Sequence, residues 1–153
     1  MTNILFDTNI ALSIIRAKDL PGIIEFLNPQ NSIRYISVAS EAELKSLALR
    51  NRWGTNRQIS LNDFLDEVNI MDINQSHLTT YAEIDAYSQR LNPNFENYPF
   101  DTPRNMGKND LWIASLAALL GLTLVTTDSD FDHLHKVFFE VRNINPKEFL
   151  PFF

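Results

Sequence analysis

The sequence contains no cysteine, which excludes a disulfide framework and a thiolate zinc site and suits a reducing cytosol. It also lacks a run apolar enough to cross a membrane, because the longest such stretch, residues 111–125, is shorter than the ~20 residues that a spanning helix needs. A strand-like segment begins at residue 3, so we expect no signal sequence. These absences predict a soluble, cytoplasmic protein that does not bind a membrane.

The chain also lacks an excess of positive charge. Its 13 Lys and Arg residues against 19 Asp and Glu residues give a net charge of −6, which argues against a broad basic surface for binding nucleic acid. An acidic site with a modest basic rim could still act on nucleic acid, and an acidic chain suits a basic partner protein. The residues available for such a rim are Lys45, Arg50, Arg52, Arg57, Arg104 and Lys108.

The length of 153 residues and the hydrophobic content of 44% are enough for one domain with a buried core. No repeat, low-complexity tract or linker divides the chain, so we expect a single domain over residues 1–153. Strand-like and helical patterns alternate, which predicts an α/β sandwich of three layers around a mostly parallel sheet of about five strands. The expected strands are 3–6, 34–38, 69–73, 122–127 and 137–142, and the expected helices are 9–18, 20–28, 40–52, 58–68, 75–91, 109–120 and 129–135.

One long segment, residues 92–107, shows no periodicity and contains Pro93, Pro99 and Pro103. A loop of this length in a compact domain is usually functional or mobile. We expect its end to border the functional site, whereas its first half could equally be a disordered excursion.

Two acidic residues directly follow apolar segments that are typical of strands. Asp7 follows residues 4–6, and Asp128 follows residues 124–127. Ligands of a parallel sheet bind beyond the carboxyl ends of its strands. We therefore expect both carboxylates at that edge of the sheet.

A third acid, Asp110, lies in the first turn of the expected helix 109–120. It stands three residues before an apolar position of the same helix, which places it on the inward face, toward the sheet end. The buried stripe of this helix is expected to consist of Ile113, Leu116, Ala117 and Leu120.

Each acid also has a local structural explanation. Asp7 and Asp128 could be N-cap residues of the helices that follow them. Asp110 is favoured by the dipole of its own helix, and Ser40 with Glu43 matches a capping box. These local roles do not explain the position of the acids relative to the core. Clustered carboxylates repel one another unless a cation neutralises them, so a divalent metal ion is the simplest explanation.

The donor atoms indicate the type of metal. Oxygen ligands without His or Cys suit Mg²⁺ or Mn²⁺ better than zinc. Magnesium usually meets its substrate through phosphate oxygens and can activate a water for attack on phosphorus. The implied reaction is phosphodiester hydrolysis.

Four short segments resemble, in their order and spacing, the motifs of PIN-domain ribonucleases, and more narrowly those of VapC toxins from bacterial type II toxin–antitoxin modules. They are residues 5–9, 36–44, 107–114 and 124–131, so the resemblance spans nearly the whole chain. It implies a PIN-like fold and a metal-dependent endoribonuclease that cuts structured RNA, such as tRNA or rRNA. It also implies inhibition by a cognate antitoxin protein, and homodimerisation.

The resemblance also implies roles for individual residues. The catalytic, metal-binding acids would be Asp7, Glu43, Asp110 and Asp128, and Asp130 would support the metal or its waters. The residues that orient these carboxylates would be Thr8, Asn9 and Thr126. The candidate substrate contacts are Arg104, Lys108 and Asn109. Helical periodicity does not distinguish Glu41 from Glu43, and the family's pattern of Glu followed by Leu favours Glu43.

The sequence argues against a phosphatase that forms a phosphoaspartate, because such an enzyme needs a second Asp two residues after Asp7, where this chain has Asn9. Two other functions remain open from the sequence. They are a non-toxin PIN nuclease in RNA processing and a catalytically inactive PIN-like module that binds nucleic acid or protein. The apolar tail, residues 149–153, either packs against the domain or contacts a second copy or an antitoxin.

Overall fold

A computed structural model of the chain describes residues 3–153, and its centre is a single sheet of five parallel strands in the order β3–β2–β1–β4–β5. The central strand β1 pairs on one side with β2 and on the other with β4, so that Leu5 lies between Tyr35 and Leu124. This arrangement confirms the predicted α/β fold. The strands are β1 (Ile4–Phe6), β2 (Arg34–Ser37), β3 (Asn69–Met71), β4 (Thr123–Thr126) and β5 (Val141–Asn143).

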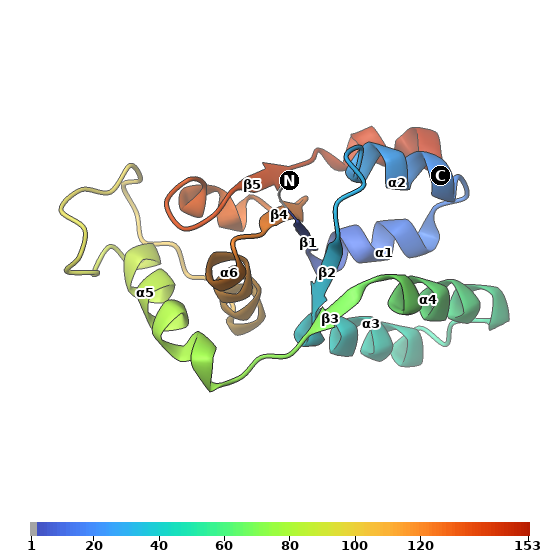
Figure 1. Cartoon of the computed structure of the whole chain (residues 1–153), viewed down its shortest axis with the longest axis horizontal. Coiled ribbons are helices and arrows are strands. Elements are labelled where there is room, and N and C mark those ends of the chain that lie inside the picture. The colour runs from blue at the N-terminus through green and yellow to red at the C-terminus, as the bar shows by residue number, and fades with distance from the viewer. Residues whose placement is uncertain (1–2) are drawn as a thin grey trace.

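Helices cover both faces of the sheet, as Figure 1 shows. On one face lie α1 (Thr8–Arg16), α2 (Leu20–Leu27), α3 (Val38–Arg50), α4 (Thr55–Glu67) and the 3₁₀ helix η3 (Pro146–Phe152). On the other face lie α5 (Leu78–Ser88), α6 (Lys108–Leu120) and the 3₁₀ helix η2 (Ser129–Leu134). A further 3₁₀ turn, η1 (Gln75–His77), leads into α5. None of the helices described between residues 3 and 153 is long and apolar enough to span a membrane.

The central strands are buried on both faces because their apolar side chains alternate between two cores. Phe6 and Val125 pack under α1–α4, whereas Leu5 and Leu124 pack under α5 and α6, and all four side chains are fully buried. This burial fixes the ends of β1 and β4 side by side in the middle of the sheet. The residues that directly follow β1 and β4 therefore also lie close together, at the carboxyl edge of the sheet.

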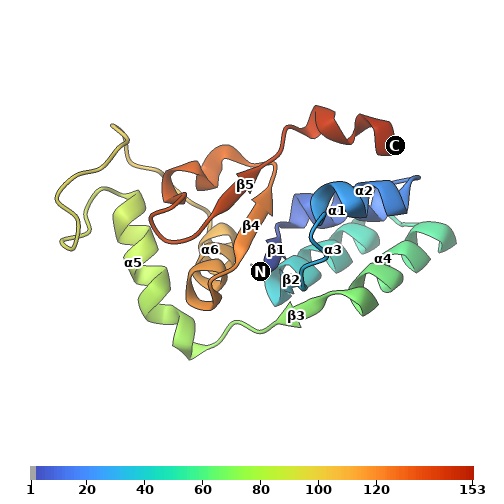
Figure 2. The same cartoon turned by 45° about the horizontal axis from the view of Figure 1, so that its top comes forward.

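The apolar C-terminal tail packs against the domain, which is the first of the two alternatives above. Phe149 is buried and meets the ring of Phe26 edge-on at 6.0 Å. The backbone N–H groups of Lys18 and Asp19 donate hydrogen bonds of 2.9 and 3.0 Å to the carbonyl of Phe152. In the view of Figure 2, η3 lies above α1 and α2 at the C-terminal end of the chain.

The segment between α5 and α6 has no regular structure, yet its first half is packed and not a loose excursion. The rings of Phe95, Tyr98 and Phe100 lie within 4.6 to 5.5 Å of the buried ring of Tyr87. Asn92 donates hydrogen bonds to the backbone and the carboxylate of Glu83. Aromatic packing therefore holds this half against α5.

Several predicted boundaries were wrong. Helix α3 begins at Val38, because the Ser37 hydroxyl accepts from the N–H of Ala39 and turns the chain directly from β2 into the helix. The capping box that offered a local explanation for Glu43 does not form, since Ser40 and Glu43 both lie inside α3. A single helix over residues 75–91 was also wrong, because η1 precedes α5 and α5 ends at Ser88.

Two further predictions failed near chain turns. Leu120 is 44% exposed, because it is the last residue of α6 before the left-handed Gly121. Strand β5 begins only at Val141, because a tight turn with Lys136 at φ 60° and a bridge from His135 to Phe139 precede it.

Candidate functional site

The candidate site lies at the carboxyl edge of the sheet. Asp7 follows β1 and Asp128 follows β4, and these two strands are neighbours. Glu43 lies in the second turn of α3, which starts from the carboxyl end of β2, and Asp110 lies in the first turn of α6, which leads back to β4. Parallel topology thus brings together four acids that are far apart in the sequence.

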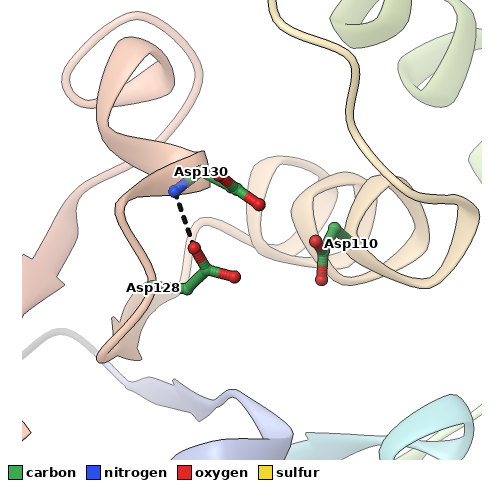
Figure 3. A group of neighbouring side chains, drawn as sticks. All are labelled: Asp110, Asp128 and Asp130. Atoms are coloured by element: carbon green, nitrogen blue, oxygen red, sulfur yellow. Dashed lines mark hydrogen bonds between the residues drawn. The ribbon is translucent and has the colours of Figure 1, made fainter.

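Three of the acids form a compact cluster. Carboxylate oxygens of Asp110, Asp128 and Asp130 all lie within 4.8 Å of one another. Figure 3 shows Asp110 on α6 facing Asp128 and Asp130, which lie on the segment that follows β4. Asp128 is also the N-cap of η2, and its Oδ1 accepts a 2.9 Å hydrogen bond from the N–H of Asp130. The capping contact therefore fixes the two acids relative to each other.

Asp7 is the most buried of the acids, with 5% of its surface exposed, and its carboxylate is held from both sides. Its Oδ1 accepts from the N–H of Thr8 at 2.7 Å as the N-cap of α1. Its Oδ2 accepts from the Thr126 hydroxyl at 2.7 Å, and that hydroxyl accepts from the N–H of Asp128 at 3.0 Å. Thr126 thus links the two acids that end β1 and β4.

The structure brings Glu43, and not Glu41, toward the other acids. The side-chain amide of Asn109 donates a 3.0 Å hydrogen bond to Glu43 Oε1 and joins α3 to α6. Glu43 and Asp110 line one open pocket together. Glu41 instead forms an ion pair of 3.2 Å with Lys45 on the surface of its own helix.

The remaining predicted residues differ in their contacts. Asn9 is exposed and lines an open pocket with Glu43, whereas the Thr8 hydroxyl donates to Ser40 Oγ at 2.9 Å. Lys108 is exposed at the start of α6, in the pocket that Glu43 and Asp110 line. Arg104 instead contacts Phe100, with 6.0 Å from guanidinium carbon to ring centre, and donates from its backbone N–H to the Ser88 carbonyl.

Two contacts near the acids were not predicted from the sequence. Buried Ser40 accepts from the Thr8 hydroxyl and joins the first turns of α1 and α3, whereas its sequence context suggests a helix cap. Asn143 donates to the carbonyl of Asp128 at 3.1 Å and to Asp132 Oδ1 at 3.0 Å. No sequence signal indicates this role, since Asn143 lies 15 residues beyond Asp128.

Burial and the charges of neighbouring acids raise the pKa of three of the acids, Asp7, Glu43 and Asp110. Burial first, and then the charges of the neighbouring acids, raise the pKa of Asp110 from 3.8 to about 7. Burial also raises the pKa of Asp7, despite its hydrogen bonds, and burial followed by the charge of Asp7 raises the pKa of Glu43.

Within the described residues, these acids form no ion pair with a basic side chain. Among residues 3–153, no Lys, Arg or His nitrogen lies within 4.0 Å of the carboxylate of Asp7, Glu43, Asp110, Asp128 or Asp130. The cluster therefore requires protons or a cation to offset its repulsion.

Comparison with known proteins gives the family. No protein with a curated description matches the sequence. Solved structures with a similar fold include VapBC2 from Rickettsia felis bound to a DNA fragment from their promoter, with 24% identity, a TM-score of 0.70 and coverage of 92% of this chain and 97% of that chain. VapBC-1 from nontypeable Haemophilus influenzae has 23% identity, a TM-score of 0.66 and coverage of 92% and 96%. VapBC-5 from Mycobacterium tuberculosis has 21% identity, a TM-score of 0.60 and coverage of 94% and 100%.

At these identities the structural likeness shows the fold, while the sequence itself shows the family. The family model of the PIN domain matches residues 4–137, which is most of the chain. The chain therefore belongs to the PIN domain family.

Proposed function

We propose that the protein is a divalent-metal-dependent endoribonuclease that hydrolyses RNA phosphodiester bonds. The observation that carries this proposal is the convergence of Asp7, Glu43, Asp110, Asp128 and Asp130 at one edge of the sheet with no compensating basic group among residues 3–153. Such a cluster destabilises the folded protein unless protons or a cation offset its charge, and a bound cation does so while the acids stay ionised. Membership of the PIN domain family supports the same reading.

The donor set fits a hard cation. Asp110, Asp128 and Asp130 offer oxygens within 4.8 Å of one another. Opposite ligands of an octahedral Mg²⁺ are ~4 Å apart, so small side-chain movements would let these three acids hold the ion. Asp7 and Glu43 would complete the acidic set, and Mn²⁺ could replace Mg²⁺ because oxygen ligands suit both.

A bound cation would supply Lewis-acid activation of water and neutralisation of charge on the phosphate. The side chains around the site would orient the acids: Thr126 holds Asp7, and Asn109 holds Glu43. Thr8 would act through its backbone N–H on Asp7, and Asn9, which is exposed and lines an open pocket with Glu43, would help to orient that carboxylate.

We assign substrate contacts to the rim of the site. Lys108 is exposed beside Asp110, so its ammonium group can reach a phosphate oxygen. Asn109 would contact substrate with the part of its amide that does not hold Glu43. Arg104 is the weaker candidate, because its observed contacts are with Phe100 and Ser88.

We further propose that the protein is the toxin of a VapBC-type module that works as a single domain over residues 1–153 in the cytoplasm. The fold that it shares with VapBC structures supports this proposal. Its RNA substrate would be a tRNA or rRNA, its partners a cognate antitoxin and a second copy of the chain. Expression should arrest growth, and co-expression of the small protein encoded beside it should restore growth. Growth unaffected by expression would leave a PIN nuclease of RNA processing as the better reading.

The nuclease proposal is tested with purified protein and total tRNA. Cleavage should require Mg²⁺ or Mn²⁺, stop with EDTA and fall at least a hundredfold in Asp110→Asn, since removal of a metal ligand is expected to cost this much or more. The matched control is Asp66→Asn, which changes an exposed acid on α4. Cleavage that survives EDTA, or that proceeds in Asp110→Asn at the wild-type rate, would exclude the assignment. Absence of all metal-dependent cleavage would favour an inactive PIN-like binding module.

A further inference from the structure

A basic patch lies where α1 ends and α3 turns into α4. Its members are the exposed side chains of Arg16, Lys18, Arg52 and Arg57, and they line an open surface pocket with the half-buried Trp53. In a chain with 13 Lys and Arg residues and a net charge of −6, a local excess of positive charge is an exception. It points to a negatively charged ligand at this place.

Within the described part of the chain, ion pairs do not neutralise the charges of the patch. Among residues 3–153, no carboxylate lies within 4.0 Å of the charged group of Arg16, Lys18, Arg52 or Arg57. Arg16 lies in the last turn of α1, where the helix dipole favours a cation. The dipoles of α1 and α3 also favour Lys18 and Arg52, which directly follow the C-caps of these helices. They do not explain Arg57, which lies in the first turn of α4, where the dipole disfavours a cation.

Trp53 adds a half-buried aromatic ring to the patch, and part of this ring packs against the core under α1–α4. The backbone N–H of Trp53 donates to the Ala48 carbonyl at 3.0 Å, and the preceding Arg52 takes a left-handed φ of 50°. This turn therefore holds Trp53 in place. The Arg57 guanidinium lies 5.7 Å from the centre of the Trp53 ring. Aromatic rings among cations are the arrangement that binds single-stranded nucleic acid, by base stacking and phosphate contact together.

An open groove leads from the acids toward the patch. Glu43 and Arg50 line it along α3, and Asn9 of α1 lines it beside Glu43. Glu43 and Arg50 are seven residues apart, which is two helical turns or ~10 Å. Figure 1 shows α1 and α3 extending in the same direction from the ends of β1 and β2. The patch is therefore within a few nucleotides of the acids along a single strand.

We propose that the basic patch binds the sugar–phosphate backbone of a single-stranded part of the RNA substrate, with Trp53 stacked on a base. This places an RNA contact surface at the far ends of α1 and α3, apart from the contacts at Lys108 and Asn109. The proposal rests on the proposed ribonuclease function and adds where the strand lies relative to the acids.

The first test measures binding without cleavage. Affinity for a fluorescein-labelled oligouridylate is measured in EDTA for the wild type and for Arg52→Gln/Arg57→Gln. The control is Lys136→Gln/Lys147→Gln, which also removes two exposed, unpaired charges and also includes a left-handed position, Lys136 at φ 60°. For single strands each lost phosphate contact lowers the slope of log K against log salt by ~0.7, so the patch variant should lose a slope of ~1.4 and bind at least tenfold more weakly. Equal loss in both variants, or none in the patch variant, overturns the proposal.

The second test reports on Trp53 directly. The chain has two tryptophans, so Trp112→Phe leaves Trp53 as the only one. Added oligouridylate should quench its fluorescence, and Arg52→Gln/Arg57→Gln should weaken this quenching. Bound RNA without quenching overturns the stacking contact. Equal quenching by polyglutamate shows that the patch binds an acidic protein segment and overturns the assignment to RNA.

The two proposals fail in different ways. If the wild type cleaves RNA in a metal-dependent manner but the patch variant binds oligouridylate with unchanged affinity, the patch assignment is wrong and the nuclease stands. If the patch variant loses affinity as expected but the wild type cleaves no RNA under any metal condition, the nuclease is wrong and the patch remains a nucleic-acid contact.

Discussion

Replacing Asp110 by Asn should stabilise the metal-free protein at high pH, although it removes a proposed catalytic acid. In the folded chain the pKa of Asp110 is raised from 3.8 to about 7, so the folded state holds a proton there that the unfolded state has already released. The stability that goes with this protonated carboxyl is fully present below pH ~4, where Asp is protonated even in the unfolded chain. It is lost as the pH rises through about 7, the pKa of Asp110 in the folded chain. At pH 8 the carboxylate is charged in both states and opposes folding, whereas Asn carries no charge.

The size of this stability difference follows from the shift in the pKa of Asp110. About three pKa units correspond to roughly 4 kcal/mol at full strength, and solvent screening of a partly exposed carboxylate reduces this to roughly 1–2 kcal/mol. The free energy of unfolding of Asp110→Asn in EDTA should therefore exceed that of the wild type by roughly this amount at pH 8 and by much less at pH 5.

Urea denaturation followed by circular dichroism at pH 5, 6.5 and 8 measures this difference. Addition of Mg²⁺ at pH 8 should stabilise the wild type and not Asp110→Asn, because only the wild type retains the cluster. Asp66→Asn, on the exposed side of α4, should show neither effect. A variant that is less stable than the wild type by the same amount at every pH would refute the reasoning, since Asp110 would then serve the fold and not a cation site.

Three further predictions follow from individual contacts. Thr126→Val removes the hydroxyl between Asp7 and Asp128. It should lower the Mn²⁺ affinity measured by calorimetry 10- to 100-fold and lower the unfolding free energy by roughly 1–3 kcal/mol. An unchanged Mn²⁺ affinity would contradict the positioning role of Thr126. Glu43→Gln should reduce metal-dependent RNA cleavage, whereas Glu41→Gln loses only a surface ion pair and should cleave RNA at the wild-type rate. Loss of cleavage in Glu41→Gln and wild-type cleavage in Glu43→Gln would identify Glu41 as the second acid. Phe149→Ala leaves a cavity beside Phe26 and should lower the unfolding free energy by roughly 3–5 kcal/mol in urea titrations, and a loss below 1 kcal/mol would mean that the tail is not part of the core.

The parts of the fold and site that follow from local pattern could be predicted from the sequence. Apolar runs indicate buried strands. The positions of Asp7 and Asp128 at the carboxyl edge of the sheet follow because each residue directly follows such a run. Asp110 follows from its place in the first turn of a helix. Glu43 does not, because periodicity leaves Glu41 equally acceptable, and only the family resemblance favoured it.

The parts that depend on distant contacts could not be predicted. Helix η3 contains Pro151 and has no helical periodicity, and it forms because Phe149 and Phe152 pack on Phe26. The order within the first half of the α5–α6 segment depends on rings that surround Tyr87. The resemblance implies that Asp130 supports the metal or its waters, but the closeness of its carboxylate to those of Asp110 and Asp128 depends on the fold.

The proposed role of the acids at the carboxyl edge of the sheet is to hold a divalent cation. A crystal structure of the protein soaked in Mn²⁺, with anomalous diffraction data, locates such an ion directly. We expect an anomalous peak between the carboxylates of Asp110, Asp128 and Asp130, and its loss in Asp110→Asn. Well-ordered carboxylates without a peak at saturating Mn²⁺, or a peak confined to another surface, would contradict this role.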